Sequence, residues 1–124
     1  MAIRIDISFD TKYKIDQGAI KRVVEEVLKN RGKEGEMEVS VTIVGESRMK
    51  ELAKKWLMDD EVHDVMSWPL EETVSPDGVL YLGDIAVCFP KAAKQAEKSK
   101  TSVMAQICRL AEHGTLHLLG IHHD

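Results

Sequence analysis

The sequence has no excess of basic residues, few cysteines and no long apolar run, and each absence excludes a class of protein. A formal net charge of -4 provides no overall positive field to attract nucleic acid, so an RNA contact would need a local patch. Two cysteines, Cys88 and Cys108, are too few for a disulfide framework. We expect both to be small buried hydrophobic residues, kept reduced in the cytosol.

No apolar stretch approaches the roughly 20 residues that a membrane-spanning helix needs. The segment 1–10 alternates apolar and polar residues and lacks the apolar stretch of a signal peptide. We therefore expect a cytoplasmic protein with no membrane association. A length of 124 residues suits one domain over 1–124 with one hydrophobic core.

Hydrophobic periodicity predicts an α+β fold. Four segments have the short apolar or alternating patterns of strands: 3–9, 37–44, 64–69 and 79–89. Four others have helical spacing or helix-start signals: 16–30, 46–57, 90–100 and 101–119. The last two strands are close enough to pair as a hairpin. We expect a small mixed sheet of about four strands, packed helices and a metal-site helix at the C-terminus.

The chemistry lies in the last dozen residues. His113 and His117 are four residues apart, so on a helix both rings project from one face, one turn apart. Gly120 is a natural helix end and lets the chain turn, so that His123 can return as a third ligand. The spacing selects His123 over His122, which we expect to support a ligand or face solvent.

Three neutral imidazoles with an open fourth position make a catalytic zinc arrangement. We therefore predict one zinc ion per chain on His113, His117 and His123, where it would lower the pKa of bound water. Nickel or copper could outcompete zinc in vitro by affinity. Zincin peptidases carry a glutamate directly after the first histidine, but this chain has Gly114. We expect a metal-dependent hydrolase that is not a peptidase, with close backbone packing at Gly114.

The segment 113–123, His-Gly-Thr-Leu-His-Leu-Leu-Gly-Ile-His-His, resembles the signature of the YbeY family of bacterial endoribonucleases, His-Gly-x-Leu-His-Leu-x-Gly-Tyr-Asp-His. The segment 64–69, Asp-Val-Met-Ser-Trp-Pro, is similar to that family's Asp-Val-Leu-Ser-Phe-Pro, and 82–85 matches its Leu-Gly-Asp-Ile. The order of elements agrees as well, so the resemblance covers nearly the whole chain. It implies an α+β fold and one zinc ion on the three histidines.

The resemblance also implies the substrate and the partners. These are single-stranded ribosomal RNA, especially the 3′ end of the small-subunit RNA, and the ribosome, in rRNA maturation and ribosome quality control. Two positions depart from the family pattern. Tyr-Asp before the last histidine is Ile121-His122 here, and the usual arginine upstream of 64–69 falls at about Leu57. The missing arginine removes a bidentate phosphate partner. The connector that follows is acidic, with Asp59, Asp60 and Glu61.

Basic side chains offer further RNA contacts. Arg109 lies one turn before His113 and could contact phosphate near the metal, although a surface arginine fits equally well. Lys91, Lys94 and Lys98 form a basic stripe, which is the best local candidate for binding the RNA backbone. Such stripes are more often solvated helix faces.

Five other side chains could be functional or purely structural. Asp84 could orient a ligand histidine or cap a turn, and Ser67 could bind phosphate or complete an edge strand. Trp56 and Trp68 lie in apolar patterns, which favours the core over base-stacking platforms. We take His63 as a surface residue.

These observations favour a zinc-dependent endoribonuclease acting on single-stranded ribosomal RNA. One alternative is a metal-dependent hydrolase of another substrate, such as a small phosphoester or a peptide. A second is a ribosome-associated RNA-binding factor with structural zinc and weak or no nuclease activity, which Leu57 and the acidic connector favour. A third is a plain α+β binding domain whose histidines hold nothing.

Overall fold

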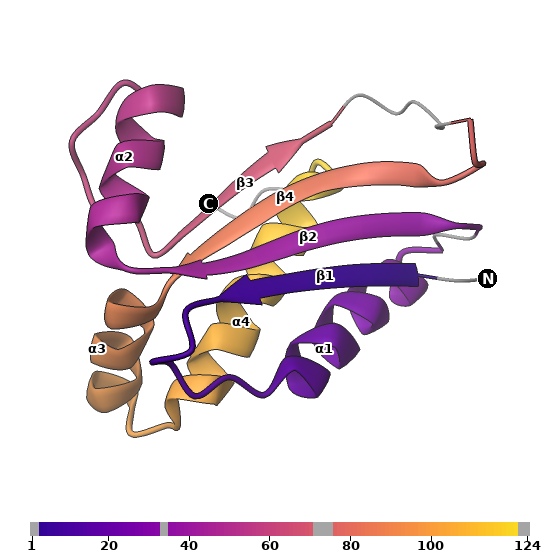
Figure 1. The fold of residues 1–124 in the computed structure, drawn as a ribbon. Coiled ribbons are helices and arrows are strands. Elements are labelled where there is room, and N and C mark those ends of the chain that lie inside the picture. The colour runs from indigo at the N-terminus through magenta and orange to yellow at the C-terminus, as the bar shows by residue number, and fades with distance from the viewer. Residues whose placement is uncertain (1–2, 33–34, 71–75, 122–124) are drawn as a thin grey trace.

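The computed structural model describes residues 3–32, 35–70 and 76–121 (Figure 1). Helices and strands alternate along most of the chain, and each predicted segment is present with shifts of a few residues at its ends. The elements are β1 (Ile3–Phe9), α1 (Gln17–Asn30), β2 (Met37–Val44), α2 (Glu46–Trp56), β3 (Val65–Pro69), β4 (Leu80–Cys88), α3 (Phe89–Ser99) and α4 (Val103–Leu118). Within these ranges, no helix combines the length and apolar character needed to cross a bilayer.

The four strands form one mixed sheet in the order β1-β2-β4-β3. β2 lies parallel to β1 and β4, and β3 pairs antiparallel with β4, from Val65 opposite Val87 to Pro69 opposite Gly83. The predicted hairpin and the α+β class are therefore confirmed. Pro69 ends β3 at the sheet edge, where the missing N–H of proline costs no ladder hydrogen bond.

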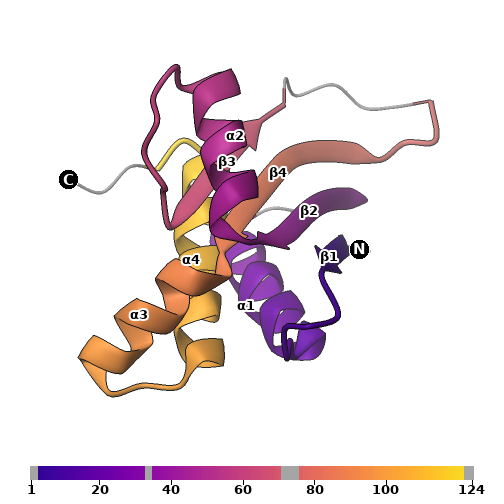
Figure 2. The ribbon, with the colours of Figure 1, turned by 60° about the vertical axis from the view of Figure 1, so that its left-hand side comes forward.

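The two faces of the sheet are covered unequally. Alternate residues of β2 and β4, such as Val41 and Ile85, pack against α1 and α4 in the main hydrophobic core. Among the described residues, α2 is the helix that packs on the opposite face, through a smaller cluster that includes Met49, Ala53 and Ala86. Figures 1 and 2 show α2 at one end of the sheet, with the strands extending beyond it. Part of this second face therefore remains open.

Two glycines let the chain pack closely where β3, β4 and α4 meet. A Cβ atom on Gly114 would lie 2.8 Å from Cγ2 of Ile85, so α4 is pressed onto β4 at this point, as predicted for Gly114. Gly83 has a φ of +145°, and a Cβ atom there would lie 2.2 Å from the Trp68 carbonyl oxygen. These contacts hold the hairpin against the histidine-bearing helix.

Both cysteines are free thiols. Cys88 is buried and Cys108 is half-buried, and burial raises the pKa of each thiol. The expectation of a small buried hydrophobe is confirmed for Cys88 and only in part for Cys108.

Candidate functional site

Helix α4 presents two of the three predicted metal ligands together. It begins at Ser102, whose Oγ accepts a hydrogen bond from the Ala105 N–H at 3.0 Å. Its opposite side is anchored in the core by buried residues such as Ile107, and full burial of one such side chain stabilises the fold by about 1.5–3 kcal/mol. The half-buried rings of His113 and His117 have centroids 4.2 Å apart and planes inclined by 52°.

The helix ends as predicted at Gly120. Its φ of +80° is the left-handed conformation of a helix cap, and its N–H donates to the His117 carbonyl at 3.0 Å. The N–H of Ile121 donates to the Leu116 carbonyl at 3.0 Å, which completes the cap. The predicted third ligand, His123, and its neighbour His122 lie outside the described residues.

A small pocket of about 220 Å³ opens beside the histidine helix. It lies at the free edge of β3, where the end of α2, the connector and α4 converge. We call it the His117 pocket, and its lining includes Trp56, Leu57, His63, Ser67, Trp68 and His117.

The His117 pocket changes how several residues are interpreted. Leu57, which we expected at about the position of the family's arginine, forms part of its wall, so an apolar side chain lies beside His117. Ser67 also lines it and is available to a phosphate. His63 was expected at the surface, and it is half-buried in this pocket, so that expectation is confirmed only in part. The connector has no periodicity from which its fold could be predicted.

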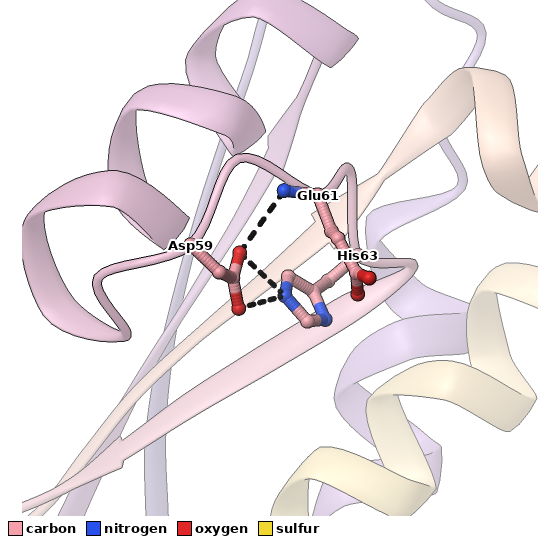
Figure 3. A group of neighbouring side chains, drawn as sticks. All are labelled: Asp59, Glu61 and His63. Carbon is pink, nitrogen blue, oxygen red and sulfur yellow. Dashed lines mark hydrogen bonds and ion pairs between the residues drawn. The ribbon is translucent and has the colours of Figure 1, made fainter.

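His63 belongs to a group of ligand-type side chains in the connector (Figure 3). Its Nε2 lies 3.1 and 3.2 Å from the two carboxylate oxygens of Asp59, which also accepts the Glu61 N–H at 3.0 Å. One ligand atom from each of Asp59, Glu61 and His63 falls within 4.8 Å of the others, so this connector cluster could also hold a metal ion. Two carboxylates and one imidazole favour a harder cation than three imidazoles do.

A polar chain ties the start of β3 to the helices. Gln106, which is buried, donates to Oε1 of Gln95 at 2.7 Å, and Gln95 donates to the Asp64 carboxylate at 2.9 Å. The Asp64 carbonyl accepts the Cys88 N–H at 2.8 Å. Asp64 is the first residue of the family-like segment 64–69, so we assign it a structural role that the sequence did not reveal.

The remaining candidates lie away from the His117 pocket as far as the described lining shows. Asp84 is exposed on the sheet face opposite α4 and lines a different hollow from the His117 pocket. Arg109 is exposed on α4. Of the α3 lysines, Lys94 and Lys98 are exposed and Lys91 is half-buried. Their roles in RNA binding stay predictions.

The tryptophans also depart from expectation. Trp56 is 54% exposed, so its expected place in the core was wrong. Trp68 is half-buried and packs against the α2 cluster, which agrees in part with the expectation. The two rings contact edge to face, with centroids 6.3 Å apart.

Comparisons with known proteins agree with this architecture. The family model described as Endoribonuclease YbeY matches residues 6–124. The chain is 35% identical over 105 residues to the endoribonuclease YbeY of Persephonella marina, covering 85% of this chain and 68% of that one. It is 33% identical over 126 residues to that of Clavibacter michiganensis, covering 96% and 81%.

A Thermotoga maritima protein of known solution structure superposes with a TM-score of 0.62 at 26% identity. The alignment covers 97% of this chain and 75% of that one. The extent of the family match confirms both the resemblance and the predicted enzyme class, a nuclease. The chain belongs to the endoribonuclease YbeY family.

Proposed function

We propose that this protein is a zinc-dependent endoribonuclease that cleaves single-stranded regions of ribosomal RNA. Its work would be maturation of the 3′ end of the small-subunit RNA and ribosome quality control, with the ribosome as partner and the cytoplasm as location. The observation that carries the proposal is the pair His113 and His117 on one face of α4, beside a pocket, in a chain of an endoribonuclease family.

The residues present fit a zinc ion. His113 and His117 supply two imidazoles from one rigid helix, and His123 is proposed as the third ligand. Imidazole nitrogen is a preferred donor for zinc, and three protein ligands leave a position open for substrate. When bound, zinc would supply Lewis acid chemistry toward a phosphodiester.

The chain's own side chains would orient the RNA. Ser67 and His63 offer hydrogen-bonding groups inside the His117 pocket, where a scissile phosphate would lie. Trp56, Leu57 and Trp68 give that pocket apolar walls, which limit the water around the phosphate. In this arrangement the polar groups position the substrate and the apolar groups strengthen each polar contact.

One observation favours a second function. Leu57 is 51% exposed and lines the His117 pocket, and the resemblance to the family signature puts the usual arginine at about this residue. A chain without that cation would bind phosphate more weakly. It could then act as a ribosome-associated RNA-binding factor in which zinc is structural and cleavage is weak or absent.

A cleavage assay separates the two functions. The substrate is a single-stranded fragment of the small-subunit RNA 3′ end, and the comparison is the same fragment annealed into a duplex. We expect zinc-loaded wild type to cleave only the single strand, and His117→Ala to lose more than the 10–100-fold typical of outer-shell changes at metal sites. Normal binding to small subunits with no cleavage by wild type would support the binding factor instead.

A further inference from the structure

The open face of the sheet carries a groove that the metal site does not use. This sheet groove has a volume of about 570 Å³. Its floor is mixed: Ser40, Thr42 and Asp84 provide polar groups on this side of the sheet, and Val44 and Ala86 provide apolar ones. Its wall includes Trp56 from α2 and Leu70 after β3.

Trp56 connects the sheet groove with the His117 pocket. Trp56 and Trp68 line both hollows, so the two meet at this pair of rings. Because the Trp56 indole contacts Trp68 edge to face, it is held in place while more than half of it stays exposed. An indole that is more than half exposed can stack on a planar ligand.

The charges around Trp56 suit a polyanion on one side only. Lys54 and Lys55 are exposed on the last turn of α2, and Nζ of Lys55 lies over one face of the Trp56 ring, 5.2 Å from its centroid, so a base would stack on the other face or displace this lysine. Asp84 is exposed on the floor and would repel phosphate. A strand in the groove would therefore place its phosphates toward α2 and its bases toward the hydroxyl groups of the floor.

We propose that Trp56 is a base-stacking platform for single-stranded RNA, and that the bound strand runs from the His117 pocket into the sheet groove. The inference rests on the proposed function in taking RNA as the ligand. Proteins that bind single strands combine aromatic platforms with cations beside the backbone, and the neighbours of Trp56 provide both. A partner helix would need a continuous apolar floor, whereas hydroxyls and a carboxylate interrupt the apolar side chains of this one.

The test measures binding by the zinc-loaded full chain to an eight-nucleotide single-stranded 2′-O-methyl RNA, which resists cleavage. We expect Trp56→Ala to raise the Kd about 5- to 150-fold, the loss that corresponds to one base stack. Trp56→Phe should stay within about threefold of wild type because it keeps an aromatic face. Met58→Ala is the matched control, since Met58 is 90% exposed and lines neither hollow, and its Kd should be unchanged.

Fluorescence provides a second readout. The sequence has two tryptophans, so in Trp68→Phe the emission comes from Trp56 alone. We expect the RNA to quench this emission, and an abasic oligonucleotide of the same length to leave it nearly unchanged. Equal affinity of wild type and Trp56→Ala, or equal quenching by the abasic strand, would overturn the inference.

Two further outcomes separate this inference from the nuclease proposal. If wild type cleaves RNA and Trp56→Ala cleaves and binds it equally well, the stacking platform is wrong and the nuclease stands. If RNA binding depends on Trp56 but no cleavage occurs, the platform stands and the nuclease fails.

Sedimentation of a dimer that Trp56→Ala dissociates, with RNA binding unchanged, would assign the exposed indole to self-association and overturn the inference.

Discussion

Two regions of this molecule offer metal ligands, and they do so by different means. His113 and His117 project from a helix whose other side is anchored in the core, so their spacing is set by helical geometry. The connector cluster, Asp59, Glu61 and His63, lies in an irregular segment held by its own hydrogen bonds. A ligand pair on a helix can therefore be predicted from its spacing in the sequence, whereas ligands that a loop brings together can be identified only from the folded structure.

The donor types differ in the same way. Imidazoles on α4 suit zinc, while the two carboxylates of the connector cluster suit magnesium or manganese. His117 and His63 nevertheless line one pocket. Substitutions in each region can show which of them holds the metal and how strongly metal binding, cleavage and stability depend on the neighbouring residues.

The largest difference should appear in zinc content. We expect wild type and His63→Ala to carry one zinc ion per chain and His117→Ala to carry almost none, because His117 is a proposed zinc ligand and His63 is not. Elemental mass spectrometry after purification without a histidine tag provides the measurement. If His117→Ala kept its zinc and His63→Ala lost it, the metal site would have to be assigned to the connector cluster.

A smaller effect is expected at Leu57. Leu57→Arg should speed RNA cleavage about tenfold or more, because a hydrogen bond to a charged partner contributes about 1.5–3 kcal/mol. Leu57→Lys adds the same charge without the bidentate fork and should gain less. Single-turnover cleavage rates would show the order, and a rate that Leu57→Arg lowers would mean that this wall of the pocket does not meet phosphate.

The next largest effect is expected on stability, from a change in the packing of α4 beneath the histidines. Gly114→Ala places a Cβ atom 2.8 Å from Cγ2 of Ile85, so we expect a loss of about 1–3 kcal/mol in the free energy of unfolding. Gly18→Ala is the matched control, because Gly18 is also helical but exposed, and it should be neutral or slightly stabilising. Urea unfolding measures both, and equal stability would show that α4 can shift off the sheet without cost.

The smallest effect is expected in the connector cluster. Glu61→Gln removes one carboxylate from an exposed side chain, so the free energy of unfolding should change by less than about 0.5 kcal/mol. Zinc content should also stay at the wild-type value. Titration with manganese, followed by calorimetry, would contradict this ranking if wild type bound the ion tightly and Glu61→Gln did not.

The errors of sequence interpretation have physical causes. Trp56 continues the apolar pattern of Met49 and Ala53 on α2, but it is the last residue of that helix and the core does not extend to cover it. The partial burial of His63 was not predicted because its position depends on the irregular connector that follows Met58, where φ is +57°. The bond between Gln95 and Asp64 joins residues 31 apart, a separation at which no local pattern acts.

The sequence by itself determined the strands, the helices, the antiparallel hairpin and the spacing of His113 and His117 on one helix face, because each depends on periodicity or on neighbours along the chain. Only the tertiary structure decided that His63, Leu57 and Ser67 join His117 in one pocket and that Trp56 stays exposed at its rim. Those placements depend on how the short helix α2, the edge strand β3 and helix α4 pack together. That packing is determined by contacts between segments that are distant in the sequence.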